Sequence, residues 1–440
     1  MRKVLILSLL LGLVTALVPA AMAQPECDDA IGCVVLEEGD PIVIASALAS
    51  SGAVAFLGED SGGGIEIAIE ERDGMLLDRE IELVQEDSLC SAEGGQTAAQ
   101  RIAADEEIIG MIGTNCSSAA QAALPIISDA GMVMISSSAT SPALANPNTD
   151  EGGAYLPGFY RTAHNDLTQG AIAAQHMFEE LGATTLATIH DGSPYADGLQ
   201  IVASDTFAEM GGEVTFQGAV NIGDTDMSAI LTEIASNPPD VLYFPIFEPE
   251  GNFIAAQSAD TPGLEDTTLY GADGILIDSF PENTGDASLG MYFSGPVVSG
   301  EEYQAFLTQW EEVIGGVPPA GFHAHAYDGT RMLFMAIEEV ATEGEDGTLV
   351  IGRQALRDAL TAIEGFEGLT GSLTCSEFGD CATGEALGVF QITEAELNDG
   401  NWPPPVVWTP RDSMDDMEGE EMDMEATEEM EMEATEESDG

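Results

Sequence analysis

The sequence has 440 residues, of which 79 are acidic and ten are basic, so its formal net charge at pH 7 is −69. A surface this negative repels nucleic acids and anionic membranes, and we exclude both as partners. The length predicts two domains, each with an ample core. The charge is typical of a protein adapted for solubility or for a salty or hot habitat, and it does not identify a ligand.

The first 23 residues have the pattern of a cleaved signal peptide. A short basic stretch precedes an apolar run from Val4 to Val18, and Ala21–Ala23 has the small residues that signal peptidase recognises. The run is too short for a transmembrane helix. We predict cleavage before Gln24, no lipid on Cys27 because no lipobox precedes it, and a mature protein in the periplasm or at the cell exterior.

Residues 24–40 form a short N-terminal segment. Within it, Cys27 and Cys33 lie close in sequence and are expected to close a small disulfide loop. A turn at 38–41 predicts a hairpin between the strands Val34–Leu36 and Ile42–Ala47.

From residue 41, short apolar runs alternate with helical stretches of ten to sixteen residues. The first series has strands at Ile42–Ala47, Ile81–Glu86, Ile108–Ile112 and Met132–Ile135, and helices at about 54–71, 92–105 and 117–130. The second series has strands at Thr185–His190, Glu213–Gly218, Val241–Phe244 and Thr268–Tyr270, and helices at about 168–181, 197–210, 226–236 and 250–259. This alternation predicts an α/β fold with parallel sheets and right-handed crossovers. Two series separated by the loop-rich stretch 141–161 indicate two Rossmann-like lobes.

The remaining chain is divided between these lobes. We assign 41–160 and 297–372 to lobe one, and 161–296 and 373–410 to lobe two. Later elements are the helices Glu302–Ile314 and Phe322–Ala341 and a terminal strand pair near Gly371–Thr374 and Gly388–Thr393.

The last 30 residues, 411–440, are a low-complexity acidic segment with a repeated Met-Glu-Ala-Thr-Glu-Glu motif. Dense like charge without aromatic residues predicts a disordered tail. Soft-metal binding through its methionines and contact with a basic partner are the functional alternatives.

Six cysteines in an exported chain predict paired disulfides. Cys90 follows the strand Ile81–Glu86, Cys116 follows the strand Ile108–Ile112, and one helix separates these strands. We therefore expect the strands to be neighbours with their ends roughly 5 Å apart, which is within disulfide reach. The remaining pairs are then Cys27–Cys33 and Cys375–Cys381.

Two loops at the C-terminal edge of this first sheet are rich in hydroxyls and backbone donors. They are Gly113–Ser118, which opens a helix, and Ser136–Thr140. Open α/β sheets bind ligands at this edge, and a helix N-terminus suits a carboxylate. Ser117 and Ser118 are equally suited to cap the helix, and the pattern alone leaves both interpretations open.

The order and spacing of several segments resemble the type I periplasmic binding proteins of the leucine/isoleucine/valine-binding class. The resemblance runs from about residue 42 to residue 390, and the family's disulfide between consecutive strands matches Cys90–Cys116. The matching segments are Ile81–Ser118, Met134–Leu144, Phe159–Thr162, His190–Gly198 and Gly271–Gly274. The resemblance implies two lobes joined by three hinge crossovers, near Phe159–Thr162, Phe293–Pro296 and Gly388–Phe390.

The resemblance also implies a ligand site between the lobes. On lobe one, Ser117 donates its hydroxyl to a ligand carboxylate. The loop Ser138-Ala139-Thr140 contacts the carboxylate and the ammonium group, and Leu57 lines the side-chain pocket.

On lobe two, the resemblance implies that Tyr195 closes over the ligand, Asp273 pairs with its ammonium group and Phe247 lines the side-chain pocket. Three positions depart from the family pattern. Asp273 replaces a longer glutamate, so the ammonium contact is open to a bridging water. Leu57 and Phe247 replace positions that are commonly tyrosine or tryptophan, which leaves the side-chain preference open.

These features together predict the extracytoplasmic substrate-binding protein of an ABC importer, which captures a branched-chain or similar small amino acid. A ligand that bridges two lobes stabilises their closed form. We expect an ABC permease as partner, a monomer, and no cofactor or metal. The alternative is a ligand sensor for amides, urea or aromatic acids that acts with a separate receptor.

Catalysis is a minor alternative. The glycines at 62–64 lack the Lys-Ser/Thr of a phosphate loop, and His190-Asp191 has no nucleophile in a recognisable pattern. His323 and His325 are two residues apart on a predicted helix and point to different faces, so we predict a surface pair. We therefore predict that the protein is not an enzyme.

Overall fold

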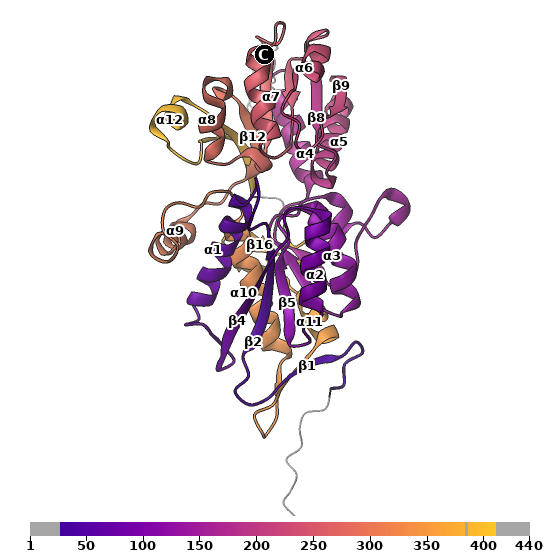
Figure 1. The fold of residues 1–440 in the computed structure, drawn as a ribbon, viewed down its shortest axis with the longest axis vertical. Coiled ribbons are helices and arrows are strands. Elements are labelled where there is room, and N and C mark those ends of the chain that lie inside the picture. The colour runs from indigo at the N-terminus through magenta and orange to yellow at the C-terminus, as the bar shows by residue number, and fades with distance from the viewer. Residues whose placement is uncertain (1–26, 383–385, 411–440) are drawn as a thin grey trace, which may run out of the picture.

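The computed structural model describes residues 27–382 and 386–410, so the predicted signal peptide and acidic tail lie outside the described residues. The described chain forms two lobes stacked along the long axis of the molecule (Figure 1). Each lobe is built on a mainly parallel sheet, with strand order β3-β4-β2-β5-β6-β7 in the first and β18-β17-β12-β11-β10-β8-β9 in the second. The predicted two-lobed α/β fold is confirmed.

The first lobe is a three-layer arrangement. Its sheet consists of β2 (Ile42–Leu48), β3 (Met75–Leu76), β4 (Arg79–Asp87), β5 (Ile108–Gly113), β6 (Val133–Ser136) and β7 (Phe159–Arg161). Helices α1 (Phe56–Glu70) and α10 (His323–Val340) lie on one face, and α2 (Ala92–Ala103) and α3 (Ser117–Asp129) on the other (Figure 1). Side chains of β2 alternate between the two cores, since Ile42 and Ile44 pack with α1 and α10 whereas Val43 and Ala45 pack with α2 and α3.

The second lobe has one continuous core around buried aromatic side chains, including Tyr243, Tyr270 and Phe293. Its strands are β8 (Thr185–His190), β9 (Glu213–Ala219), β10 (Val241–Tyr243), β11 (Thr268–Ala272), β12 (Tyr292–Pro296), β17 (Leu387–Gln391) and β18 (Val406–Trp408). Its helices are α4 (Asp166–Gln175), which continues as a π-helical turn (His176–Glu180), α5 (Pro194–Glu209), α6 (Ser228–Ala235), α7 (Glu250–Ala259), α8 (Ser279–Thr284) and α12 (Glu394–Asp399).

Smaller elements complete the chain. They are β1 (Cys33–Leu36), β13 (Thr342–Glu343), β14 (Leu349–Gly352), β15 (Phe366–Gly368), β16 (Gly371–Leu373), α9 (Glu301–Val313), α11 (Arg353–Thr361) and 3-10 turns at Pro142–Ala145, Thr149–Glu151, Asp273–Ile275 and Gly285–Ser288. None of the described helices combines the length and apolarity needed to cross a bilayer.

Two predicted strand pairings are wrong. β1 pairs with β14 instead of forming a hairpin with β2, because β2 is already paired on both sides, with β4 and β5. The expected terminal pair is also divided, since β16 pairs with β15 whereas β17 lies between β12 and β18. Both errors come from pairing strands that are close in sequence.

All three predicted disulfides are present, but the reasoning for Cys90–Cys116 contained an error. β4 and β5 are not neighbours, because β2 lies between them. The loop after β4 passes over the end of β2, where Ser88 N donates to Leu48 O at 2.8 Å. Leu89 and Cys90 then adopt left-handed backbone conformations, with φ of 52° and 50°. This turn brings the Cys90 and Cys116 Cα atoms to 5.2 Å.

Removing the Cys90–Cys116 bond by the double change Cys90→Ala/Cys116→Ala is expected to lower the free energy of unfolding by about 3 kcal/mol, because it frees a long loop in the unfolded chain. The sequence separation is 26 residues, compared with six for Cys27–Cys33. The matched change Cys27→Ala/Cys33→Ala should therefore cost less, about 2 kcal/mol. Urea unfolding measures both, and an equal or larger loss in the Cys27/Cys33 variant would contradict this account.

The predicted assignment of residues 373–410 to lobe two differs from the structure at its start. Leu373, Cys375 and Cys381 are buried in a core cluster of the first lobe. The loop closed by this disulfide extends the end of β7, since Arg161 N donates to Gly379 O at 2.9 Å and Cys381 N donates to Arg161 O at 3.1 Å. β17 is therefore the first element after this loop that belongs to the second lobe.

Candidate functional site

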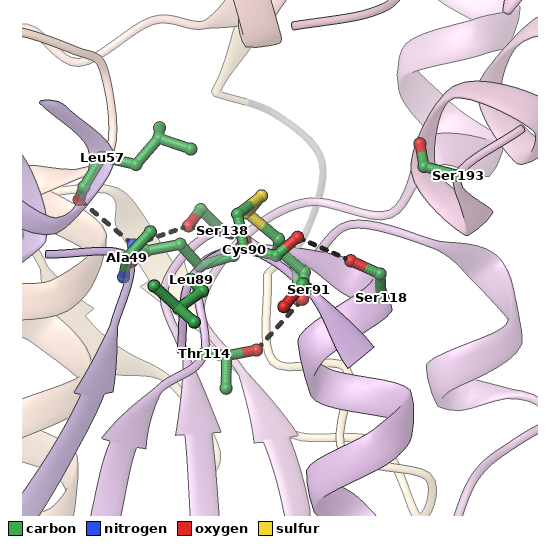
Figure 2. Close-up of a disulfide and its surroundings, with 12 residues drawn as sticks. Ala49, Leu57, Leu89, Cys90, Ser91, Thr114, Ser118, Ser138 and Ser193 are labelled. Atoms are coloured by element: carbon green, nitrogen blue, oxygen red, sulfur yellow. Dashed lines mark hydrogen bonds between the residues drawn. A yellow bond between two sulfur atoms is a disulfide. The ribbon is translucent and has the colours of Figure 1, made fainter. Parts of the chain in front are cut away.

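The N-terminus of α3 opens toward the second lobe. Cys116 is its N-cap residue, in an extended conformation, and makes no side-chain capping bond. The Ser118 hydroxyl instead donates to Cys90 O at 3.1 Å (Figure 2), and Ser117 Oγ accepts from Ser141 N at 3.1 Å. Neither bond is a helix cap, so the capping interpretation was wrong. The first-turn N–H groups of α3 remain suited to an anionic ligand.

Asn115 holds this loop against three other segments, and the sequence analysis did not single it out. Its side chain is buried; Oδ1 accepts from Ala49 N at 2.8 Å, and Nδ2 donates to Leu57 O at 3.2 Å. Nδ2 also lies 2.9 Å from Ser61 Oγ and 3.3 Å from Ser138 Oγ. These contacts fix the positions of Leu57 and Ser138, two of the predicted ligand residues.

The loop after β6 is held from beneath by a buried arginine. Ser136 Oγ accepts from Ala139 N at 2.9 Å. The fully buried Arg161 guanidinium donates through one nitrogen to Ala139 O at 3.0 Å and Ser141 O at 2.9 Å, and its Nε pairs with Asp380. Arg161 therefore ties the ligand loop to the Cys375–Cys381 loop.

On the second lobe, Asp273 follows β11 and faces the same space. Its Oδ1 accepts from Gln169 Nε2 at 2.6 Å and from the Tyr195 hydroxyl at 3.0 Å. Burial raises the pKa of Asp273 to about 6, although both hydrogen bonds oppose the rise. The ring of Phe247 lies against Tyr195, with their centroids 5.0 Å apart.

A second carboxylate, Asp166 at the start of α4, lies beside this group. It is fully buried, and neither its oxygens nor the Thr140 hydroxyl has a hydrogen-bond partner of good geometry among the described residues. Asp166 N donates to Thr140 O at 3.1 Å. Burial and the neighbouring charge of Asp273 raise the pKa of Asp166 well above its usual value. Neither aspartate forms an ion pair with a described residue.

These two surfaces enclose one narrow cavity between the lobes. Its lining residues are Leu57, Asn115, Cys116, Ser117, Ser138, Tyr195, Phe247, Asp273 and Phe322. Its volume is about 10 Å³, roughly the room for one water molecule. The structure therefore brings donors from lobe one and an acidic group from lobe two to a single enclosed space.

Two of the predicted residues do not line this cavity. Ala139 and Thr140 are fully buried in the loop behind it. Phe322, in contrast, was missed, because its sequence position indicates only the start of a helix.

The histidine pair of α10 was predicted on the surface, and this was wrong. His323 and His325 are each 3% exposed. Both lie in the first two turns of α10, where every residue from 323 to 330 is buried, so the opposite helix faces that they occupy are both covered. No group of three or more metal-ligating side chains occurs among the described residues.

A family model described as periplasmic binding protein matches residues 41–399. The chain belongs to the periplasmic binding protein family. Its relatives include a leucine-, isoleucine-, valine-, threonine- and alanine-binding protein of Pseudomonas aeruginosa, with 28% identity over 78% of this chain and 87% of that protein. A leucine-specific-binding protein of Salmonella typhimurium is 31% identical over 58% of this chain and 68% of its own length.

Solved structures agree with this membership. A leucine-binding protein from Thermotoga maritima superimposes with a TM-score of 0.73 and 25% identity, over 84% of this chain and 99% of its own. A solute-binding protein from R. palustris in complex with benzoate superimposes with a TM-score of 0.70 and 20% identity, over 84% and 96%. The predicted resemblance to the leucine/isoleucine/valine-binding class is thus confirmed, and the last comparison supports the fold alone.

Proposed function

We propose that this periplasmic binding protein is the exported substrate-binding component of an ABC importer and that it holds a small α-amino acid between its lobes. The observation that carries the proposal is the cavity in which lobe-one donors face the buried carboxylate of Asp273. An α-amino acid has the complementary pair of charges, a carboxylate and an ammonium group. Relatives of this chain are named for binding leucine and similar amino acids.

The ligand carboxylate is assigned to the first lobe. Ser117 Oγ already accepts a hydrogen bond from Ser141 N, so its own proton is free to be donated to a ligand. The first-turn N–H groups of α3 supply further donors, and a helix N-terminus favours negative charge. Ser138 lines the same space, but its hydroxyl already donates to Asn115 O at 3.1 Å. The site therefore binds a carboxylate without needing an arginine or lysine.

The ligand ammonium group is assigned to the second lobe. Both protein hydrogen bonds to Asp273 end on Oδ1, and we assign Oδ2 to the ammonium. Asp166, whose pKa the charge of Asp273 helps to raise, and Thr140 lie nearby, and their polar side-chain atoms have no hydrogen-bond partner of good geometry among the described residues. A cation placed there would further offset the desolvation of two neighbouring carboxylates, which the charge of Arg161 and the hydrogen bonds of Gln169 and Tyr195 oppose without preventing the rise in pKa.

Transport requires the two lobes to separate and close again. The cavity is too small for an amino acid in the described conformation, so the lobes must move apart to admit one. A ligand that contacts Ser117 and Asp273 together stabilises the closed arrangement, because only that arrangement makes both contacts. We infer that the permease recognises this closed form of a monomer, delivered to the cell exterior by its signal peptide.

The affinity for L-leucine is expected to fall about tenfold between pH 7.5 and pH 5. The pKa of Asp273 is about 6 without a ligand, and only the ionised form pairs with an ammonium group. Below that pKa, binding must first remove a proton from Asp273. Titration calorimetry at several pH values measures the effect, and an affinity that is constant from pH 7.5 to pH 5 would contradict it.

Aromatic acids are the second candidate ligands, because Tyr195, Phe247 and Phe322 line the cavity. A protein of the same fold is known in complex with benzoate. An aromatic acid without an ammonium group, however, would place no positive charge beside Asp166 and Asp273, whose pKa values burial already raises. A thermal-shift panel of amino acids, amides, urea and hydroxybenzoates separates the candidates. If hydroxybenzoates raise the melting temperature and no α-amino acid does, the proposal fails.

A further inference from the structure

A second and larger cavity lies beside the candidate site, with walls from both lobes. Its volume is about 350 Å³, within the range of small-molecule sites. The turn at 320–323 separates the two cavities, since Phe322 lines the first whereas Ala320, Gly321 and His323 line the second. Its other lining residues are Leu276, Pro296, Val297, Val298, Tyr303, Gln304, Leu307, Gly316, Val317, Pro318, Phe390, Trp402, Pro403, Pro404 and Val406.

The lining of this cavity is unlike the rest of the chain in its charge. None of these residues is Asp, Glu, Lys or Arg, although the sequence contains 79 acidic residues. Aliphatic side chains, prolines and the rings of Tyr303, Phe390 and Trp402 form most of its surface. Such a lining favours an uncharged ligand with a flat, apolar body.

A series of hydrogen bonds from Asp60 through His323 fixes one polar group of the cavity lining, the Tyr303 hydroxyl. Asp60 is fully buried and accepts from Ala320 N at 3.1 Å and Phe322 N at 2.8 Å. His323 Nδ1 lies 2.9 Å from Asp60 Oδ1 and 3.0 Å from Ala320 O. Both neighbours of Nδ1 are acceptors, so Nδ1 carries the hydrogen.

In the neutral imidazole, Nε2 of His323 is then the acceptor. It lies 2.7 Å from the Tyr303 hydroxyl, which donates its proton to Nε2 in this state of the ring. Burial, together with the charge of Asp60, raises the pKa of Tyr303, so the phenol keeps that proton at neutral pH. With its proton donated to His323, Tyr303 Oη can only accept a hydrogen bond from a ligand, so the ligand must supply a donor.

We propose that this cavity is a second ligand site, which binds a compact, uncharged aromatic molecule carrying one hydrogen-bond donor, such as a phenol. The ring would lie among the apolar side chains, and its hydroxyl would donate to Tyr303 Oη. Because the walls come from both lobes, a bound molecule is thermodynamically coupled to their arrangement.

The surroundings of the cavity disfavour carboxylates. An adjoining hollow of about 260 Å³ shares Val317 and Trp402 with it and is lined by Asp278, Glu282 and Glu396. This preference is opposite to that of the first cavity, whose donors suit a carboxylate. The two cavities can therefore be distinguished by 4-methylphenol and 4-methylbenzoate, which differ only in the polar group on the ring.

Tryptophan positions allow a site-specific test on the full chain. The sequence has three tryptophans, Trp310, Trp402 and Trp408, and of these Trp402 alone lines either cavity. With 5-fluorotryptophan incorporated, a Trp402→Phe variant assigns the Trp402 fluorine signal. Saturable displacement of that signal by 4-methylphenol is expected, with toluene about tenfold weaker because it lacks the donor and 4-methylbenzoate without effect.

Three variants complete the test. Tyr303→Phe should weaken 4-methylphenol about tenfold without changing toluene. Leu307→Phe/Val317→Phe should abolish the displacement by filling the cavity, whereas Ile222→Phe, a matched change at a residue 73% exposed elsewhere, should preserve it. The Trp310 and Trp408 signals report whether each variant is folded. A Trp402 signal that 4-methylphenol does not move, or a Tyr303→Phe variant that binds it as wild type does, would overturn the proposal.

Discussion

Asp273→Asn is expected to weaken the binding of L-leucine about a hundredfold at pH 7.5, because truncating one partner of a buried charge pair costs several kcal/mol. The substitution keeps the size of the side chain and an oxygen to accept from Gln169 and Tyr195. It removes only the negative charge. The loss therefore measures the ammonium contact itself, and titration calorimetry records it.

The same substitution has an opposite effect on the stability of the unliganded protein. Because burial raises the folded-state pKa of Asp273 from 3.8 to about 6, the folded chain binds more protons than the unfolded chain between these values. Its contribution to stability is thus unfavourable at pH 7 and is relieved as the pH falls through 6 toward 4. Asp273→Asn should be at least as stable as wild type at pH 7.

A matched control distinguishes the effect of the charge on Asp273 from the effect of changing the net charge of the protein. Glu233→Gln also removes one negative charge from the second lobe, at an exposed position on α6. It should leave the affinity for leucine unchanged. Equal losses in the two variants, or full affinity in Asp273→Asn, would remove Asp273 from the site.

Arg161→Met is expected to lower the free energy of unfolding by about 3–5 kcal/mol, the cost of breaking a buried charge pair by removing one partner. The side chain of Arg161 is fully buried, and it pairs with Asp380 and donates to the carbonyls of Ala139 and Ser141. Methionine fills much of the same space but leaves those oxygens unpaired. Urea unfolding measures the loss.

The affinity for leucine should fall in the same variant, because Arg161 holds the loop that carries Ser138 and Thr140. Arg101→Met is the matched control. Arg101 also pairs with a carboxylate, that of Glu86, but its side chain is 66% exposed. Its replacement should change stability by less than about 0.5 kcal/mol. A similar loss in both variants would show that the burial of Arg161 does not matter.

The alternation of apolar runs predicted the central strands of both sheets, because a strand or helix is determined largely by its own residues. The short or peripheral strands β3 and β18 were not predicted. The order of strands was not predictable in the same way. β2 lies between β4 and β5 although one helix alone separates those two strands in sequence. The order of strands depends on the face of the sheet on which each crossover helix packs. The residues that determine this packing are spread over the whole lobe.

The candidate site likewise contains residues that were predicted from the sequence and residues that were not. Ser117 and Ser138 were predicted because hydroxyls at strand ends have a recognisable pattern, and Asp273 was implied by the family resemblance. All three line one cavity. Asn115 and Asp166 were not singled out. Asn115 matters because it contacts segments that are distant in sequence, and Asp166 matters because it is buried. Neither property is visible in the local sequence.

The predicted boundary between the lobes at residue 373 lies too early in the chain. The loop closed by Cys375–Cys381 precedes β17 without a composition signal, and its packing on the first lobe follows from backbone pairing with Arg161. Pairing of this kind is independent of side-chain pattern.

The most direct test of the proposed amino-acid site compares three ligands that share one aliphatic body. They are L-leucine, 4-methylpentanoate, which lacks the ammonium group, and 3-methylbutylamine, which lacks the carboxylate. Because the site has separate groups for each charge, titration calorimetry at pH 7.5 should show leucine binding at least about a hundredfold more tightly than either analogue. Binding of 4-methylpentanoate as tightly as leucine would contradict the assignment of Asp273 to an ammonium group.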